Sequence, residues 1–380
     1  MQLSVIILNY NVRYFLEQCV LSVQKALEGI DGEIIVIDNA SSDDSCEMMK
    51  TKFPNIKLIE NKDNLGFPKG NNIGVAQAKG KYICILNPDT VVAEDTFSKI
   101  LSFVKSSEVE IFSSNSQLGI IGCKLIDGAG NFLPESKRGV PTPWVAFTKI
   151  FGLYKISNYF GKYYAQHLSE NESGKVDILV GAFMVMKREL YLQVGGFDEN
   201  CFMYSDDIDL SYLVLKTGKS NYYFHETSVI HYKGESTVRD GTYMKRFREA
   251  MQFFYKKHFK KSWFFDVMMQ VGSFIFSLLK KNQQKNGART IDEYVVFSKG
   301  NLELNLSKKT TYLSDFNQFV NQPQKNLEII FDTTTFSFAE IITFMQLNKC
   351  KNLSFKNYIS SSNYLIGSNN SNDRGQIILL

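Results

Sequence analysis

Short runs of aliphatic and β-branched residues recur along the first part of the chain, and polar or amphipathic segments of helix length separate them. Three runs extend from Leu3 to Leu8, from Glu33 to Asp38 and from Ile56 to Glu60. A fourth begins at Tyr82 and stops abruptly at Asn87. Because strands that alternate with helices are typical of α/β proteins, this pattern predicts a doubly wound, mostly parallel sheet.

Two of these runs lead into a carboxylate. Asp38 closes the second run, and Asp89 follows the fourth in a stiff Asn-Pro-Asp-Thr turn. Ligands of open parallel sheets bind at the carboxyl ends of the strands, and a fixed carboxylate there suits a hard cation that holds a diphosphate. Either aspartate could instead only cap the helix that follows it. The residues alone leave both interpretations open.

A loop rich in glycine and asparagine, from Asn64 to Gly74, follows the third run. Such a loop can bring backbone and side-chain amides close to a ligand at the start of a helix. Its spacing matches neither a Walker phosphate loop nor a dinucleotide-binding fingerprint. These two nucleotide folds are therefore excluded.

Carboxylates crowd again in Asp206-Asp207-Ile208-Asp209, at the start of a helix that we predict for Ile208 to Thr217. Like charges this close raise the pKa of one carboxyl, while the helix start lowers it. One of these groups can therefore serve as a general base. We expect Asp209 to cap the helix or to face solvent.

His231 follows a strand-like segment, Thr227 to Ile230, and precedes a polar turn that contains Lys233. A neutral imidazole is a good ligand for Mn²⁺-type ions. A buried histidine bonded to a backbone carbonyl is the alternative. We expect His225 to be structural, and Lys233 to contact a phosphate or to lie in a solvated loop.

Composition bears on the cellular environment. The 380 residues have a net charge of +4, and the six cysteines are widely spaced with no C-x-x-C pair. We expect buried thiols in a reducing compartment. The first strand begins almost at Met1, so we expect no signal peptide and a cytoplasmic location. The length suits one large domain and a smaller one.

Positive charge is concentrated between Lys245 and Lys285, where ten lysines and arginines accompany two acids. The apolar stretch inside it has a longest charge-free run of 13 residues, Val267 to Leu279, whereas a membrane-spanning helix needs ~20. We expect residues 261–285 to form a basic amphipathic helix at a membrane surface, or a helix that packs against protein. No nucleic-acid recognition module accompanies the lysines, so we expect no nucleic-acid partner.

Residues 286–380 are expected to form a small α/β domain after a polar linker. Strands are predicted at Tyr294–Phe297, Leu327–Phe331 and Leu353–Lys356, with a helix at Phe338–Leu347. Homo-oligomerisation, or docking to an assembly partner, is a hypothesis for this domain.

Seven motifs between Ser4 and Thr237 follow one another in a recognisable order. They are SVIILNYN (4–11), VIDNASSDDS (36–45), NLGFPKGNN (64–72), ILNPDTVV (85–92), GAFMVMKRE (181–189), GGFDENCFMYSDDIDLSYLVLKTG (195–218) and HYKGEST (231–237). This series resembles the motifs of family 2 glycosyltransferases with the GT-A fold, and especially the rhamnosyltransferase-like enzymes that build bacterial surface polysaccharides.

The resemblance implies a GT-A catalytic domain over residues 1–260, with a donor half (1–118) and an acceptor and base half (119–260). It implies an inverting transfer of a sugar from a nucleotide-diphosphate donor, of the dTDP-rhamnose or UDP-hexose type, to a hydroxyl of a glycan or lipid-linked acceptor. It also implies a divalent cation, Mg²⁺ or Mn²⁺, and work at the inner face of the cell membrane.

The resemblance further implies roles for single residues. Asp207 corresponds to the catalytic base and Asp206 to its acidic neighbour, while Asp89 and His231 correspond to metal ligands. Asp38 corresponds to the aspartate that hydrogen-bonds the nucleotide base. The residues implied in nucleotide-sugar binding are Asn9, Tyr10, Asp38, Asn39, Asn64, Gly66, Phe67, Gly70, Asn71, Asn72, Asn87, Gly181 and Ala182.

This chain departs from the family pattern in two places, with Asn87 where an acid is usual and Asp206 where a glutamate is usual. A catalytically silent nucleotide-sugar or glycan-binding module is therefore one alternative. A nucleotidyltransferase is another, but it should show a glycine- and basic-rich loop after the first strand, where this chain has Asn9-Tyr10-Asn11-Val12. We expect the aromatic-rich segment from Gly119 to Val176 to shape the acceptor groove.

Overall fold

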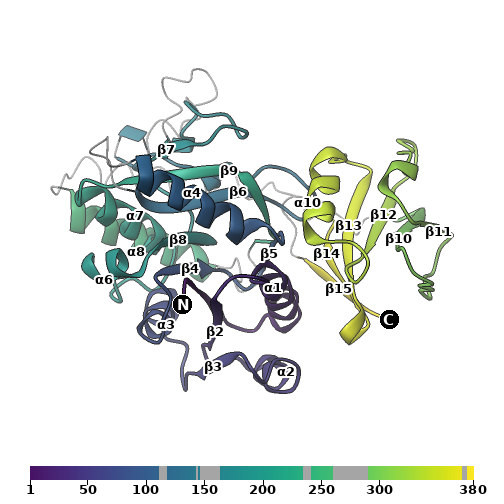
Figure 1. Cartoon of the computed structure of the whole chain (residues 1–380), viewed down its shortest axis with the longest axis horizontal. Helices are drawn as coiled ribbons and strands as arrows, with labels where there is room; N and C mark the ends of the chain where they lie inside the picture. Colours follow the sequence, from purple (N-terminus) through teal and green to yellow (C-terminus); the bar gives the residue numbers. More distant parts are fainter. Residues whose placement is uncertain (111–117, 143, 146–162, 234–240, 260–289, 370–374) are drawn as a thin grey trace.

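The structure is a computed structural model that describes residues 1–110, 118–142, 144–145, 163–233, 241–259, 290–369 and 375–380. Two sheets dominate these residues, one built from the first 231 residues and the other from the C-terminal part (Figure 1). The predicted basic amphipathic helix at 261–285 lies outside the described residues. No helix among those that are described is long and apolar enough to cross a membrane.

The first sheet begins with four parallel strands, in the order β3-β2-β1-β4. Their bounds are Leu3–Asn9 (β1), Gly32–Asp38 (β2), Lys57–Glu60 (β3) and Tyr82–Leu86 (β4). The helices between and after them are Arg13–Ala26 (α1), Ser45–Lys52 (α2), Gly66–Ala76 (α3) and Thr96–Glu110 (α4). The predicted doubly wound α/β arrangement is confirmed, and Asn9 lies opposite Asp38 at the carboxyl edge.

The same sheet continues past β4 in the order β8-β6-β9-β5, with β7 paired to β9. These strands are Thr90–Val92 (β5), Leu118–Ile126 (β6), Gly174–Val176 (β7), Phe183–Lys187 (β8) and Ser220–His231 (β9). Helices Arg188–Gln193 (α6), Asp206–Lys216 (α7) and Gly241–His258 (α8) accompany them. The two halves expected on either side of residue 118 therefore share one continuous sheet.

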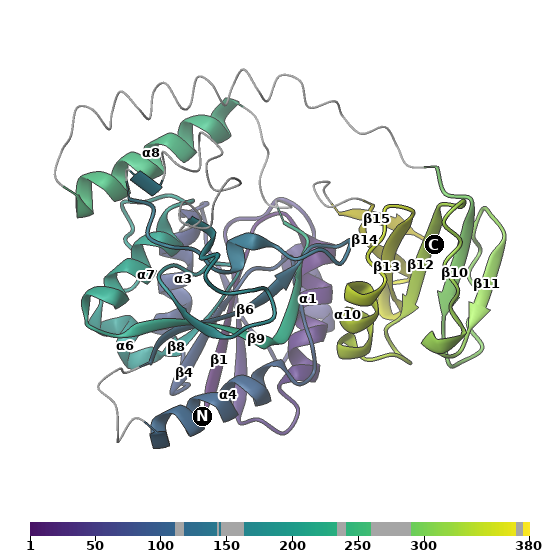
Figure 2. The ribbon, with the colours of Figure 1, turned by 90° about the horizontal axis from the view of Figure 1, so that it is seen from above.

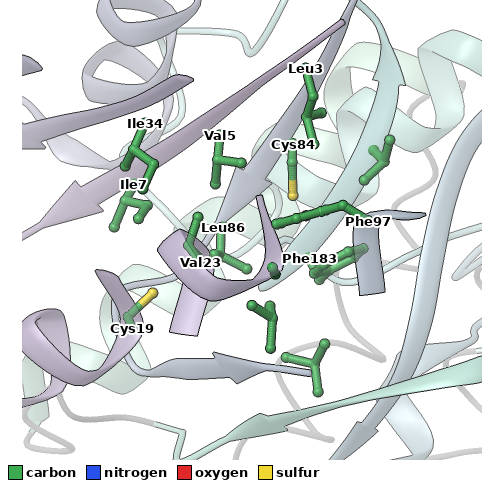
Figure 3. Close-up of a cluster of buried hydrophobic side chains, with 14 of the residues drawn as sticks. Leu3, Val5, Ile7, Cys19, Val23, Ile34, Cys84, Leu86, Phe97 and Phe183 are labelled. Carbon is green, nitrogen blue, oxygen red and sulfur yellow. The ribbon is translucent and has the colours of Figure 1, made fainter. Parts of the chain in front are cut away.

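Strand periodicity distributes the core over both faces of this sheet. Val5 and Ile7 point into a cluster with α1 and α4, and Figure 3 shows these residues beside Cys84, Phe97 and Phe183. The alternate positions of β1 point to a second cluster under α3, α6 and α7. All cysteines are free thiols; four are buried, as expected, whereas Cys46 is half-buried and Cys350 is exposed.

The second sheet has the order β11-β10-β12-β13-β14-β15. Its strands are Glu293–Phe297 (β10), Thr310–Leu313 (β11), Leu327–Asp332 (β12), Leu353–Ile359 (β13), Tyr364–Ser368 (β14) and Gln376–Leu379 (β15), with helix α10 at Phe338–Leu347. The three predicted strands and the helix are present. The sequence analysis missed β11, β14 and β15, which are edge or near-edge strands of four or five residues.

This C-terminal domain is packed against the first sheet. A single cluster joins Phe338 and Ile342 of α10 to Val91, Ile230 and Tyr232 of the catalytic domain. Figure 2 shows α10 beside α1. The expected C-terminal appendage thus shares a core with β5, which begins directly after Asp89, and with β9, which ends at His231.

Polar contacts also cross this interface. The Glu94 carboxylate accepts hydrogen bonds from the backbone N–H groups of Phe338 (2.8 Å) and Ala339 (2.9 Å), at the start of α10. Lys25 donates to the carbonyl of Thr333 at 2.9 Å. A carboxylate at a helix N-terminus is stabilised by both hydrogen bonding and the helix dipole, so Glu94 is a strong anchor.

Replacing this anchor should weaken the whole chain. Glu94→Ala should lower the free energy of unfolding by about 1–2 kcal/mol, because two N–H groups at a partly buried helix start lose their acceptor. Asp95→Ala is the control, since the Asp95 side chain is 45% exposed and pairs with Lys99 in the first turn of α4; its effect should stay within about 0.5 kcal/mol. Equal effects of both substitutions in urea denaturation would contradict the anchoring role.

Candidate active site

Hydrogen bonds join the loops that follow β1 and β2. The Asp38 carboxylate accepts from Asn9 Nδ2 at 2.7 Å, from Ser41 Oγ at 2.6 Å and from the Ser41 backbone N–H at 2.8 Å. Asn11, at a positive φ of 56°, accepts from the Ser42 N–H at 2.7 Å. Three donors therefore hold the buried Asp38 in one orientation, while the neighbouring Tyr10 is half-buried.

Asn39 connects these loops to the loop after β3. Its Nδ2 donates to the Gly66 carbonyl at 3.0 Å, and its Oδ1 accepts from Asn61 at 2.8 Å. Asn64 is exposed, and its Oδ1 accepts from the Gly66 N–H at 3.0 Å. The ends of three adjacent parallel strands are thus held together by asparagine side chains.

Helix α3 carries five of the predicted donor-binding residues, Gly66, Phe67, Gly70, Asn71 and Asn72, and their environments differ. Asn71 is fully buried, and its Oδ1 has no hydrogen-bond partner within the described parts of the chain. Phe67 packs edge-on against Phe197, with ring centroids 5.5 Å apart. An added Cβ at Gly70 would lie 2.4 Å from Leu8 Cδ1, so this glycine allows α3 to approach β1.

Asn72 differs from expectation. Its amide donates to the Phe197 carbonyl (2.9 Å) and to Glu199 (3.0 Å), and its Oδ1 accepts from Tyr191 (2.5 Å) and from the Phe197 N–H (3.2 Å). An asparagine side chain has two donor hydrogens and two acceptor sites. All four are used, so Asn72 holds the loop after α6 and has no capacity left for a ligand.

Asn87, Asp89 and His231 come together at the ends of β4 and β9. His231 Nε2 lies 3.4 Å from Asp89 Oδ1 and 3.4 Å from Asn87 Nδ2. All three side chains are buried or nearly so, and His231 Nδ1 and Asn87 Oδ1 have no partner within the described residues. The pairing of β5 with β9, in which Thr90 lies opposite His231, fixes this arrangement.

These residues fit a cation that is shared with a ligand. No group of three or more His, Cys, Asp or Glu side chains in the described parts of the chain is arranged to hold a metal ion. Asp89 and His231 supply one oxygen and one nitrogen ligand that already converge. Ions such as Mg²⁺ are often bound by one or two carboxylates together with substrate phosphates. Asn87 leaves the protein one anionic ligand short of the usual family pattern.

Asp206 and Asp207 form the first turn of α7, two residues earlier than the predicted start, and both are buried. The Asp207 carboxylate accepts from Arg138 Nη2 at 2.5 Å, from the Gly181 N–H at 3.1 Å and from the Ile208 N–H at 2.8 Å. An added Cβ at Gly181 would lie 3.3 Å from the Cβ of Asp207. Glycine at 181 therefore lets the backbone approach the carboxylate.

Asp206 and Asp207 differ in their electrostatic environment. Burial and the negative charge of Asp207 raise the pKa of Asp206 to about 7, and Arg138 partly opposes this rise. Asp209 was expected to cap the helix or to face solvent, but it is buried inside the first turn of α7, and Ser205 is the N-cap. The Asp209 carboxylate accepts from Lys257 at 2.8 Å and His258 at 2.5 Å, so it holds α8 onto α7.

One hydrogen bond links the Asp89 side of the site to the Asp207 side. The Asn87 N–H donates to the carbonyl of the buried Ala182 at 3.0 Å, one residue from the Gly181 N–H that holds Asp207. Asn87 and Ala182 were predicted as donor contacts. The structure also gives them this structural role between β4 and the turn before β8.

Residues 135–138 also lie at the site, and sequence reasoning did not identify them. Glu135 forms an ion pair with Lys233, two residues after His231, so Lys233 is not simply a solvated side chain. Burial alone would raise the pKa of Glu135, but Lys233 lowers it below its usual range. Arg138 binds Asp207. The signal available in the sequence was a cluster of charges, Glu-Ser-Lys-Arg, directly before Gly139 and Pro141.

The expected acceptor segment is only partly described. Its residues 146–162 lie outside the described chain, whereas Trp144 is 57% exposed. His225, expected to be structural, bonds Ser173 Oγ through Nδ1 at 2.7 Å.

Comparisons with known proteins agree with this arrangement. A family model described as glycosyl transferase family 2 matches residues 4–195. An N-acetylglucosaminyl-diphospho-decaprenol L-rhamnosyltransferase of Mycobacterium tuberculosis is 25% identical over 249 residues, which are 63% of this chain and 78% of the relative. The rhamnosyltransferase WbbL of Escherichia coli K12 is 29% identical over 177 residues, which are 44% of this chain and 61% of the relative.

Among solved structures, this chain is similar to a mannosyltransferase of Pyrobaculum calidifontis in complex with GDP-Man and Mn²⁺. It is 17% identical, with a TM-score of 0.47 over 72% of this chain and 69% of its own. The family match covers half of the chain and includes the carboxyl ends of β1 to β4, where Asp38 and Asp89 lie. The chain therefore belongs to glycosyl transferase family 2 and is a glycosyltransferase with the mostly parallel GT-A sheet.

Proposed function

We propose that this glycosyltransferase moves a sugar, with inversion, from a nucleotide-diphosphate donor of the dTDP-rhamnose or UDP-hexose type to a hydroxyl of a glycan or lipid-linked acceptor. The observation that supports this most strongly is the pair of polar sites on either side of the Asn87–Ala182 hydrogen bond. Asp89 and His231 lie on one side, and the Asp206–Asp207 pair lies on the other. A diphosphate leaving group and an attacking hydroxyl need such separate sites.

The nucleotide would bind across the ends of β1, β2 and β3. Asp38 has accepted three hydrogen bonds from Asn9 and Ser41, and an ionised carboxylate can accept about four. The Cys46 thiol also interacts with this carboxylate, so one N–H of a base would take the place of the thiol. The buried Oδ1 of Asn71, which has no hydrogen-bond partner among the residues that the structure describes, is a second acceptor close to this edge.

The diphosphate would bind near Asp89 and His231, which would hold a divalent cation such as Mg²⁺ or Mn²⁺ together with the phosphate oxygens. When bound, that cation stabilises the negative charge that develops on the departing diphosphate. The imidazole is suited to this role because a buried neutral ring can offer a nitrogen lone pair.

Asp207 would accept the proton of the acceptor hydroxyl as that oxygen attacks the anomeric carbon. Its carboxylate is fixed by Arg138, Gly181 and Ile208, so its orientation needs little reorganisation. Asp206 lies beside it and would share the proton, because the two charges disfavour joint ionisation.

The relatives point to the acceptor class. The mycobacterial relative is named for a diphospho-decaprenol acceptor, and a Bacillus subtilis relative for teichoic acid biosynthesis. We infer a polysaccharide of the cell envelope, assembled on a lipid carrier at the membrane surface.

The transfer hypothesis is tested with Mn²⁺ and a panel of UDP-, GDP- and dTDP-sugars, by following donor hydrolysis and thermal stabilisation. Asp207→Asn should lower the turnover rate by about 100-fold or more, because a general base contributes this much. Stabilisation by the donor should stay at the wild-type level, since Asp207 does not contact the nucleotide.

Asp63→Asn, which changes an exposed aspartate just before Asn64, should leave turnover unchanged. Donor binding by the wild type without any turnover would identify a catalytically silent module. A fast Asp207→Asn variant would refute the base assignment.

Asp206 should also make stability depend on pH. Its folded pKa of about 7 lies above the ~3.9 of an unfolded aspartate, so the folded state binds more protons between these values. The free energy of unfolding should therefore fall as pH rises from about 4 to about 7. Asp206→Asn cannot ionise, so its stability relative to wild type should rise between pH 5 and pH 8. A difference that stays constant across this range, measured by urea denaturation, would exclude a raised pKa.

A further inference from the structure

We propose that Arg138 is a positioning residue of the transfer reaction, which fixes the orientation of the Asp207 carboxylate. This inference rests on the proposed function, because it assigns Arg138 a role through the base. Arg138 itself is not placed in contact with substrate.

The geometry supports one fixed orientation. Arg138 Nη2 donates both to Asp207 Oδ2 (2.5 Å) and to the Leu179 carbonyl (3.1 Å). The guanidinium is thereby tied to the turn that also provides the Gly181 N–H for the same carboxylate oxygen. Oδ1 receives the Ile208 N–H. Both carboxylate oxygens therefore accept hydrogen bonds from the protein. The directions in which their remaining lone pairs point are fixed as a result.

Stability alone is a poor reason for this pair. Arg138 and Asp207 are only 11% and 12% exposed in their side chains, and burial of two charges costs more than their attraction returns unless other groups satisfy them. Arg138 Nε is buried and has no partner among the described residues. Replacement of such a pair by apolar residues is often neutral or stabilising. A buried arginine with an unused donor is better explained by a task at Asp207.

Among the described residues, Arg138 is the cation that forms an ion pair with the Asp206–Asp207 carboxylates, through Asp207. Burial would lower the pKa of Arg138, but Asp207 raises it above its usual value, with smaller contributions from Tyr163 and Glu135. Glu135 is itself neutralised by Lys233. In the described parts of the chain, Tyr191 and Cys201 also interact electrostatically with Asp206, and neither carries a positive charge.

The residue before Arg138 provides a control for the effect of removing a buried cation. Lys137 is also buried, but its ammonium donates to the carbonyls of Tyr164, Ala165 and Leu168 and to neither aspartate. Adjacent positions therefore hold two buried cations. One acts on backbone oxygens and the other on the proposed base.

The test compares Arg138→Gln, Arg138→Lys and Lys137→Gln in the full chain with saturating Mn²⁺, using the nucleotide sugar that the wild type hydrolyses. Arg138→Gln should lower kcat by about 100-fold with little change in KM, because the base loses its orientation. The acidic limb of the pH profile of kcat should move to higher pH by about one unit or more, since the Asp206–Asp207 pair loses the positive charge of Arg138.

Arg138→Lys retains the charge, so it should keep the acidic limb at the wild-type position with a smaller loss of kcat. Lys137→Gln should lower thermal stability without moving the limb. If Arg138→Gln does not fold, Arg138→Lys decides. A displaced acidic limb in its pH profile of kcat would overturn the inference, and a reduced kcat with the limb at the wild-type pH would support it.

A wild-type kcat and profile in Arg138→Gln, alongside an inactive Asp207→Asn, would overturn the role of Arg138 and leave the proposed function intact. An active Asp207→Asn would instead refute the proposed base itself.

Discussion

The hydrogen bond from the Asn87 N–H to the Ala182 carbonyl is the constraint on which the rest of the site depends. It joins the end of β4 to the turn that precedes β8, and these two strands are antiparallel neighbours. Asp89 follows directly from one side of this bond, and Gly181, which binds Asp207, precedes the other. A small displacement at this point would change the distance between the proposed cation ligands, Asp89 and His231, and the proposed base, Asp207.

The C-terminal domain supports the same region from behind. Its helix α10 packs against β5 and β9, whose ends present Asp89 and His231. Figure 2 shows α10 beside α1, and hydrogen bonds of Lys25 and Glu94 anchor the C-terminal domain there. Hydrophobic residues of both domains form one cluster, so removing either domain would expose apolar surface of the other. The domain therefore belongs to the structure that holds the site rigid.

Sequence patterns were sufficient for the parallel half of the sheet and for α10. Strands such as β1 are buried on both faces of the sheet, so their sequences are mostly apolar. The polar segments on either side make the ends of these runs clear. Arg138 could not have been identified in this way. Its significance depends on a contact with Asp207, which is 69 residues away, and a lone arginine in a polar segment gives no periodic signal. Asn72 was predicted as a donor contact because it lies inside a binding motif. Its side chain instead holds the loop after α6 through hydrogen bonds, which the motif does not reveal.

The central claim is that one ligand spans the Asp89–His231 pair and the edge near Asp38, with its reactive carbon facing Asp207. A crystal structure of the full chain with Mn²⁺ and the nucleotide diphosphate that stabilises it best would test this most directly. The account predicts an anomalous manganese peak bound by Asp89 and His231, with the base of the nucleotide near Asp38 and open space between the diphosphate and Asp207. Manganese bound elsewhere, or a nucleotide held away from the ends of β1 and β2, would contradict it.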